Sequence, residues 1–313
     1  MSAIFETAAY GGPGWSPRTH SAREEMGTVW GRFGVGTEWS PLRAVLLHRP
    51  GAELAGASDA NAALMLATPE LKVAQEQHDS IAAAYSAAGV EVFYLEPSAT
   101  PPPNQMFVAD LMFMTPDGAI VGRPASTVRA GEERWVARRL ADLGVPILRT
   151  VGGRGTFEGA DAAWIDEKTV LLGRGLRTNA EGAAQVAATL HEIGVKVLQT
   201  DLPVGTMHLM GQLRFLDRDL AAVWPRRFAY SAIEALCGHG YTVLLFPDEA
   251  EAVRGQANNF VTLGPRRILM AAGNPRTQAF YEEAGVTCTT IVVDELLKAA
   301  GGIGCLTGVL ERE

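Results

Sequence analysis

The chain has 313 residues, of which 47% are hydrophobic and 20% charged, so it is long enough to bury a large core in one big domain or two ordinary ones. Its 35 acidic residues outnumber its 27 Lys and Arg residues, and the formal net charge is -8. That balance argues against nucleic acid and anionic membranes as partners. No apolar run approaches the roughly 18 residues of a membrane span, and the first residues lack the pattern of a secretion signal, so we expect a cytoplasmic protein without membrane association.

The N-terminal part of the chain differs in composition from the rest. Residues 10–38 are rich in Gly, Pro and Trp. We interpret residues 1–38 as an N-terminal extension packed on the remainder of the molecule, and residues 39–313 as a single catalytic domain. The extension is also a candidate for a lid over the site described below.

From residue 42 onwards one pattern recurs about every 50 residues. A helical stretch ends in Gly, a residue that suits the left-handed end of a helix, and a β-branched run follows. These glycines are Gly89, Gly144, Gly194, Gly240 and Gly285. Between them, two apolar runs flank a short polar turn, at residues 116–118, 166–168, 217–219 and 264–266. The repeating unit therefore has the order strand, turn, strand, helix, strand.

A fifth unit can be assembled from the two ends of the chain. Residues 305–313 supply its first strand, and residues 42–50, 69–88 and 90–95 supply the remainder. We therefore predict an α/β fold, a five-bladed pseudo-symmetric α/β propeller of ββαβ units closed by the N- and C-terminal strands, which leaves no sheet edge exposed. The alternative is a generic α/β protein whose Gly-Val junctions are ordinary helix-to-strand turns.

One polar residue begins the first strand of each unit, again about every 50 residues. The five are Asp110, Glu158, His208, Asn258 and Cys305. Equivalent positions of a radial fold lie on one ring around its axis, so these side chains should converge at one mouth of the ring. Because each polar group loses water on burial, chemistry is a better reason for such a cluster than stability.

The chemistry of this set points to a guanidino ligand. Two carboxylates, Asp110 and Glu158, match a planar guanidinium. Its resonance-stabilised carbon requires a strong nucleophile such as the thiolate of Cys305, and the bound cation would favour that thiolate. His208 would protonate the departing amine and then deprotonate water. We expect covalent catalysis through an amidino-thioether, with no metal and no cofactor.

From about Glu38 to Cys305, the sequence resembles the guanidino-group-modifying superfamily, the penteins, which includes arginine deiminases, dimethylarginine dimethylaminohydrolases and amidinotransferases. The segments that carry the resemblance are FVAD (107–110), FEGAD (157–161), the His-Leu pair at 208–209 and the GGxxCLT ending (301–307). The resemblance implies the five-bladed pentein fold. It also implies that Cys305 is the nucleophile, that His208 is the acid and base, and that Asp110 and Glu158 grip the guanidinium.

The resemblance implies further substrate contacts. Arg129 or Arg123, in GRPASTVRAGEE, and Arg177, in GRGLRTNAEG, match segments that hold a substrate carboxylate. We also include Asn104, Asp161 and Asn258 among the substrate-binding residues.

Two departures limit what the resemblance implies about the substrate. Met210 stands where deiminases and amidinotransferases carry an aspartate, which makes the chain more similar to the dimethylarginine hydrolases. Asn104 and Ala109, however, replace an acidic pair of those hydrolases, so methylarginine need not be the substrate.

The function that we expect is hydrolysis of a guanidine C–N bond in arginine or a substituted arginine, which gives a citrulline-like ureido product and an amine or ammonia. The first alternative is an amidinotransferase that passes the amidino group from arginine to an amine. The second is a non-catalytic binding protein on the same fold, against which the presence of both Cys305 and His208 argues. The expected partner is a small guanidino substrate, and self-association into a homo-oligomer is the other partnership that we consider.

Overall fold

The five glycines predicted to end helices adopt the backbone conformation that this role requires. In the computed structural model, which describes residues 5–55 and 59–313, all five have positive φ angles, between 74° and 87°. Gly reaches this region without the steric cost that a Cβ brings. Each of the five lies between a helix and the strand that follows it, so the predicted junctions are confirmed.

Fifteen strands of the described residues form five three-stranded sheets, which are the blades. In each blade the middle strand is antiparallel to the first strand and parallel to the third. The first strands are β3 (Met112–Thr115), β6 (Ala162–Asp166), β9 (Leu213–Asp217), β12 (Val261–Gly264) and β15 (Gly308–Arg312). The middle strands are β4 (Gly118–Val121), β7 (Thr169–Arg174), β10 (Leu220–Val223), β13 (Arg267–Ala271) and β1 (Leu42–Leu47). The third strands are β5 (Ile147–Thr150), β8 (Lys196–Asp201), β11 (Thr242–Leu245), β14 (Thr287–Ile291) and β2 (Glu91–Tyr94).

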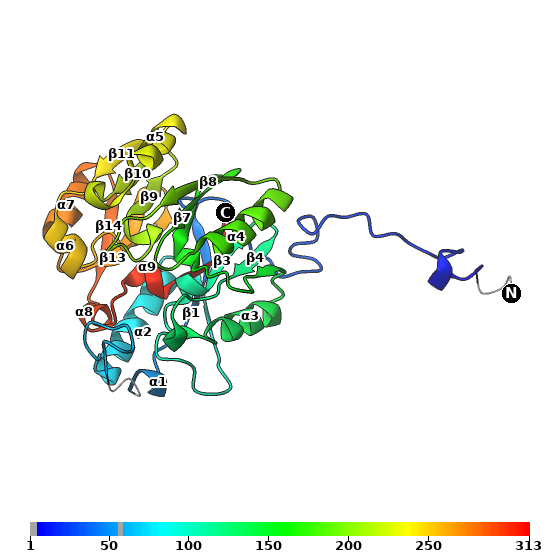
Figure 1. The fold of residues 1–313 in the computed structure, drawn as a ribbon, viewed down its shortest axis with the longest axis horizontal. Coiled ribbons are helices and arrows are strands. Elements are labelled where there is room, and N and C mark those ends of the chain that lie inside the picture. Colours follow the sequence, from blue (N-terminus) through cyan, green and yellow to red (C-terminus); the bar gives the residue numbers. More distant parts are fainter. Residues whose placement is uncertain (1–4, 56–58) are drawn as a thin grey trace.

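One long helix in each blade connects the middle strand to the third strand on the outside of the ring (Figure 1). These helices are α2 (Leu71–Ala87), α3 (Glu133–Asp142), α4 (Ala180–Glu192), α5 (Tyr230–Gly238) and α7 (Pro275–Glu283). Because the middle strands are covered on both faces, they are almost continuously apolar and buried. The shorter helices are α1 (Ala52–Ala55), α6 (Glu249–Arg254), α8 (Asp294–Leu297) and α9 (Ile303–Leu306).

The two ends of the catalytic region meet in one blade. Strands β1 and β15 pair antiparallel, with Val45 opposite Val309. This pairing closes the ring and confirms the predicted five-bladed α/β propeller with its terminal strands joined. In the parts of the chain that the structure describes, none of the helices has the length and hydrophobicity of a transmembrane segment.

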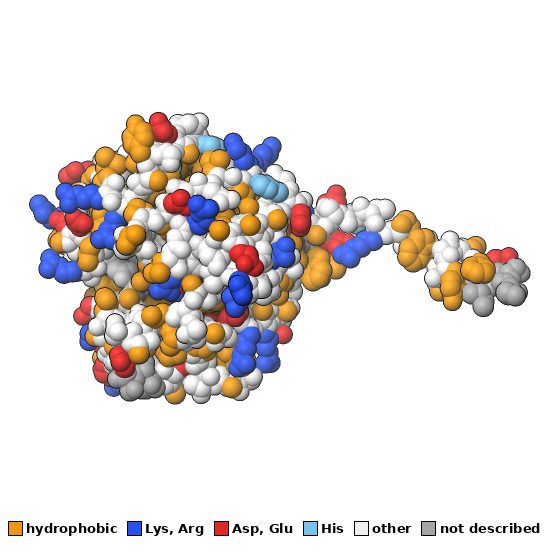
Figure 2. Space-filling model, in the orientation of Figure 1, with side chains coloured by type: hydrophobic (Ala, Val, Ile, Leu, Met, Phe, Trp, Pro, Cys, Tyr) orange, Lys and Arg blue, Asp and Glu red, His pale blue; other side chains and the backbone are white. Residues whose placement is uncertain are grey.

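The N-terminal extension contacts the ring through its later residues. Residues 5–24 are mostly exposed and include the short 3₁₀ helix η1 (Ala8–Tyr10), and Figures 1 and 2 show this part projecting away from the body. Packing on the ring begins near Arg23, which forms an ion pair with Asp117 in the turn between β3 and β4. That turn and Gly144, whose carbonyl accepts from Gly31, lie at the end of the blade opposite to Asp110. The described part of the extension therefore does not close over the predicted site, and its boundary at residue 38 stays a prediction.

Candidate active site

Short helical turns place the predicted residues where the first strands begin. The 3₁₀ helices η2 (Val108–Leu111), η4 (Gly159–Asp161) and η5 (Leu209–Gly211) directly precede or lead into β3, β6 and β9. Asp110 lies within η2, whereas Glu158 and His208 are the extended residues just before η4 and η5. Cys305 lies in α9, which appears near the centre of the ring in Figure 1. All four side chains are more than nine-tenths buried.

Gly159 allows the turns of two neighbouring blades to pack closely. A Cβ at Gly159 would lie 2.1 Å from the carbonyl oxygen of Met112 and 2.6 Å from that of Ala109. No side chain fits at such distances, so the Gly of the FEGAD segment brings Glu158 next to the turn that carries Asp110.

His208 forms the centre of an acidic cluster. Its Nε2 lies 2.6 Å from Glu158 Oε2 and 3.8 Å from Asp110 Oδ1. Burial alone would lower the pKa of His208, but the charges of Asp110 and Glu158 and the hydrogen bond to Glu158 raise it to about 9. Burial would likewise raise the pKa of Glu158, but His208 and two arginines hold it well below its usual range. At neutral pH the pair is therefore an imidazolium beside a carboxylate, and His208 can donate a proton.

Arg129 places a guanidinium on both predicted carboxylates. Its Nη1 lies 2.7 Å from Asp110 Oδ2 and 3.1 Å from Glu158 Oε2. On its other side, Nε and Nη2 lie 3.0 Å and 2.8 Å from Oε2 of Glu132. Burial would lower the pKa of Arg129, but these three carboxylates hold it above its ordinary value. The Asp110 and Glu158 side chains are thus spaced to hold a planar cation between them.

Glu132 is a member of the site that the sequence analysis missed. Its side chain is fully buried, and burial raises its pKa to about 7, against the opposing effect of Arg129. The sequence contains a signal for the pair of Arg129 and Glu132, since the acidic residue follows the arginine by three positions. Side chains with this spacing face each other on a helical turn.

The two other predicted arginines lie in different places, and one of them reaches the cavity. Arg177 lines the same cavity as Asp110, and its Nη1 lies 3.2 Å and 3.3 Å from the oxygens of Glu158. Arg123 points elsewhere, because its Nη1 donates to the carbonyl of Gly155 at 3.0 Å. Of the two candidates in the GRPASTVRAGEE segment, Arg129 rather than Arg123 therefore reaches the cavity.

The thiol of Cys305 is held by an amide from the neighbouring blade. Asn259 Nδ2 lies 2.9 Å from Cys305 Sγ, and its Oδ1 accepts from the backbone N–H of Cys305 at 3.2 Å. Burial raises the pKa of Cys305 to about 11; the charge of Asp110 adds to the rise, and the hydrogen bond from Asn259 opposes it. Without a further cation beside it, the thiol is neutral at physiological pH.

In the blade that begins with β12, the sequence predicts that Asn258 lies at the site, but the residue next to it takes that place. The amide of Asn258 donates to the carbonyl of Gly211 at 3.2 Å and accepts from the hydroxyl of Tyr281 at 3.1 Å. Asn259, not Asn258, is therefore the residue that contacts the nucleophile candidate. The adjacent asparagines in the sequence were the available signal, but a spacing of about 50 residues does not choose between neighbours.

Two hollows meet at Cys305 and His208. The smaller one, about 300 Å³, contains the charged groups; its polar lining is Asn104, Asp110, Arg129, Arg177, His208 and Cys305. We call it the guanidino pocket. Asn104 is fixed there by a hydrogen bond of 2.7 Å from its Nδ2 to the carbonyl of Ala63. The larger hollow, about 1070 Å³, extends from the other side of the thiol past Met207, Trp224 and Asn258.

Asp161 lies behind this lining rather than in it. Its oxygens accept from the hydroxyl of Thr178 at 2.6 Å and from the backbone N–H of Leu209 at 3.0 Å, and its side chain is fully buried. Burial raises its pKa to about 6. Asp161 therefore does not line the guanidino pocket in this structure, and its contacts position the turn that follows His208.

One cluster has the composition of a metal site. Ligand atoms of Asp110, Glu158 and His208 all lie within 4.8 Å of one another. Arg129 already places a positive charge on both carboxylates, so a divalent cation would have to displace that guanidinium. The donor set fits an organic cation at least as well as a metal.

Comparison with known proteins agrees with this geometry, although no protein-family model matches the chain. The N(G),N(G)-dimethylarginine dimethylaminohydrolase of Streptomyces coelicolor is 28% identical over 284 residues, which cover 85% of this chain and 96% of the relative. The chain is thus similar in sequence to the dimethylarginine dimethylaminohydrolases, and it has the five-bladed fold of the penteins.

Two solved structures of guanidino-group-modifying enzymes share its fold. One is the dimethylarginine dimethylaminohydrolase of Pseudomonas aeruginosa in complex with citrulline, with a TM-score of 0.70 and 23% identity over 87% of this chain and all of that one. Another is an amidinotransferase of the saxitoxin pathway from Microseira wollei, with a TM-score of 0.74 and 14% identity over 90% of this chain and 97% of that one. At these identities the structures establish the fold alone.

Proposed function

We propose that this pentein hydrolyses a guanidine C–N bond of arginine or a substituted arginine through a covalent intermediate on Cys305. The observation that carries the proposal is the convergence of the Cys305 thiol, the His208 imidazolium and the Asp110 carboxylate on one pocket. Glu158 lies behind this lining, against His208 and the guanidinium of Arg129. Asp110 Oδ1 is buried without a hydrogen-bond partner among the described residues, which leaves an acceptor for the substrate cation.

The proposed reaction begins with binding of the substrate guanidinium against Asp110 and Glu158. Its positive charge lowers the pKa of Cys305, and the thiol loses its proton to solvent. The thiolate then forms an S–C bond to the guanidinium carbon. His208, protonated at neutral pH, donates its proton to the departing nitrogen as the C–N bond breaks, which leaves an amidino-thioether on Cys305.

The second half of the reaction reverses the role of the imidazole. Neutral His208 takes a proton from water, and the resulting hydroxide forms an O–C bond to the amidino carbon. The S–C bond then breaks, which restores the thiolate, and the hydroxyl proton is lost to solvent, which leaves the neutral ureido product. Arg177, in this proposal, holds a carboxylate at the other end of the substrate, while Arg129 stays paired with Asp110 and Glu132.

An amidinotransferase is the second candidate, because the larger hollow also reaches Cys305 and His208. An amine that entered through this hollow could attack the intermediate in place of water. The two functions share the first half of the reaction and differ in the acceptor.

A panel of guanidino compounds tests both candidates. Arginine, methylated arginines, agmatine and short guanidino acids would each be incubated with the protein, with and without an added amine, and products identified by mass spectrometry. The proposal expects a ureido product without the amine, and none from Cys305→Ala. Product that forms only with the amine would replace the hydrolase by the transferase. Neither product nor a mass adduct on Cys305 with any compound would overturn both.

A further inference from the structure

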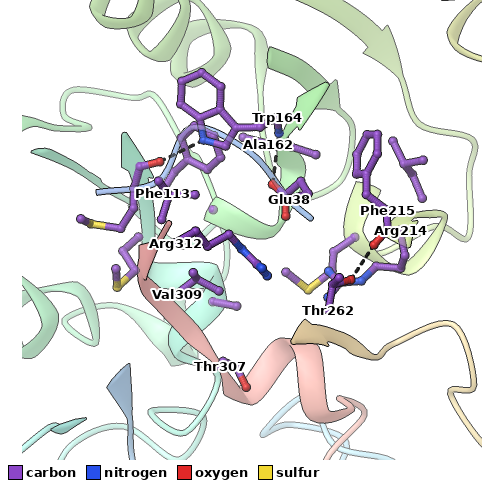
Figure 3. A pocket seen from close by; sticks show the side chains of 18 residues that line it. Glu38, Phe113, Ala162, Trp164, Arg214, Phe215, Thr262, Thr307, Val309 and Arg312 are labelled. Atoms are coloured by element: carbon purple, nitrogen blue, oxygen red, sulfur yellow. Dashed lines mark hydrogen bonds between the residues drawn. The ribbon is translucent and has the colours of Figure 1, made fainter. Parts of the chain in front are cut away.

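A second cavity lies at the centre of the ring, and the proposed reaction does not use it. It is lined by the first strands of all five blades (Figure 3). We call it the central cavity. Thr307, in its wall, is two residues beyond Cys305, and Met210 lines both this cavity and the larger hollow beside the thiol. The central cavity therefore lies directly behind the candidate nucleophile.

Two arginines extend their guanidinium groups into the central cavity from different blades. Figure 3 shows Arg214 and Arg312 reaching towards its middle. Arg214 donates to the carbonyl of Phe260, and Arg312 Nη1 donates to the carbonyl of Ser40 at 2.6 Å. Arg312 is more than nine-tenths buried, and its Nε has no hydrogen-bond partner within the described part of the chain. Neither guanidinium forms an ion pair with a carboxylate of the described residues.

The central cavity carries an excess positive charge. Its acidic residue is Glu38, whose Oε1 accepts a hydrogen bond of 3.1 Å from the backbone N–H of Trp164. One carboxylate against two guanidinium groups leaves one positive charge without compensation. Burial lowers the pKa of Arg312 to about 10, which still leaves it protonated at neutral pH. A buried charge without a partner is costly, so this arrangement favours a bound anion.

The remainder of the wall is apolar and aromatic. Trp164 and Phe113 stack with their ring centroids 5.7 Å apart, and Met112, Met114 and Phe215 lie in the same wall. Val35 and Arg312 are shared with an open hollow of about 1350 Å³ that borders the N-terminal extension. A ligand could therefore enter from the end of the ring opposite to Cys305.

We propose that the central cavity binds a small organic monocarboxylate, whose carboxylate pairs with Arg312 and Arg214 and whose apolar part lies against Trp164 and Phe113. A single negative charge matches the single excess positive charge. A guanidinium binds a carboxylate with two parallel hydrogen bonds, and the unpartnered Nε of Arg312 is one of the required donors.

Calorimetric titration of the full chain with benzoate tests the proposal. We expect saturable binding of one benzoate to the wild-type protein, with an affinity reduced about tenfold or more in Arg312→Met, which keeps an unbranched side chain and removes the charge. The guanidino pocket also contains arginines, so Arg177→Gln is the matched control, and its affinity for benzoate should be unchanged. No binding to the wild type, or a loss in Arg177→Gln with none in Arg312→Met, overturns the proposal.

A second measurement uses the wild-type arginines, so it does not depend on whether an arginine variant folds. The indole N–H of Trp164, which donates to the carbonyl of Met114 at 3.1 Å, gives a signal in ¹⁵N-labelled protein that Trp164→Phe identifies by its loss. Saturating benzoate should shift this signal in the wild-type protein. Binding that leaves the signal unmoved places benzoate elsewhere and contradicts the proposal.

Discussion

Arg129 compensates its buried charge with three carboxylates at once. Its guanidinium contacts Glu132 on one edge and Asp110 and Glu158 on the other. A substrate guanidinium that bound Asp110 and Glu158 would repel the guanidinium of Arg129. The two cations can be accommodated together only if each binds different carboxylate oxygens. Asp110 Oδ1, which has no partner among the described residues, and the second oxygen of Glu132, which also has none, are the acceptors that permit such a division.

The role of Arg177 is open to a direct kinetic test. If Arg177 holds a substrate carboxylate, Arg177→Gln should raise KM for arginine about 10- to 100-fold, since it removes a charge-assisted hydrogen bond. Agmatine has the same guanidino end but no carboxylate, so its KM should change much less. Arg123→Gln is the control, because Arg123 donates to Gly155 outside the pocket. Equal changes for arginine and agmatine would show that Arg177 does not bind the carboxylate.

The environment of Cys305 predicts how its reactivity responds to charge. Burial and Asp110 raise the pKa of the thiol to about 11, so the thiolate fraction and the rate of alkylation should increase with pH throughout the neutral range. Asp110→Asn removes a negative charge and should accelerate alkylation of Cys305 by iodoacetamide at pH 7 by about tenfold, the effect of one pKa unit. Asn259→Ala removes a hydrogen bond that favours the thiolate and should slow it.

Mass spectrometry of the alkylated peptides measures these rates, and exposed Cys237 serves as the internal reference. Its rate should be the same in the wild type and both variants. If Asp110→Asn slows the labelling of Cys305, the electrostatic account of this thiol is wrong.

At the scale of the elements, the site depends on short turns that pack between blades rather than on the strands. The register of the repeat placed Asp110, Glu158, His208 and Cys305 at equivalent positions because each such turn occupies the same place in its blade. The spacing of about 50 residues could not show whether Asn258 or Asn259 faces the site. A shift of one residue within a turn changes the direction of a side chain but hardly changes that spacing. The spacing also could not show that Thr178 and Leu209 use both oxygens of Asp161. The first contact joins residues 17 positions apart within one blade, and the second joins two blades, so neither follows the period of the repeat.

Gly159 offers a test of this packing between turns. Gly159→Ala places a methyl group against the carbonyls of Met112 and Ala109, and we expect a loss of about 3 kcal/mol in the free energy of unfolding, together with lower activity. Gly211 is the last residue of η5, where a Cβ would meet nothing within 4 Å. Gly211→Ala should therefore leave stability nearly unchanged. Denaturant titration of both variants measures the difference, and equal stabilities would contradict the proposed close approach of η2 and η4.

For the whole molecule, the recurring Gly junctions and polar turns were sufficient to predict five blades and their closure, since each blade repeats the same local signals. The extension was less predictable, because a segment rich in Gly and Pro carries no periodicity that indicates what it packs against. Arg23 and Gly31 fix its later part to the end of the ring opposite to Cys305, whereas most of residues 5–24 are exposed.

Closure of the ring should dominate the stability of the molecule, and the two ends of the chain provide a matched comparison. Deletion of residues 308–313 removes β15, leaves one edge of β1 unpaired and exposes the contacts of fully buried Leu310. We expect that variant to be largely insoluble or unfolded. Deletion of residues 1–22 removes no buried residue of the described part of the chain, so its melting temperature should stay within about 2 °C of that of the full chain. Solubility and thermal unfolding of the two truncated proteins measure the contrast. A stable, soluble protein without β15 would mean that the other four blades hold the propeller together without a closed ring.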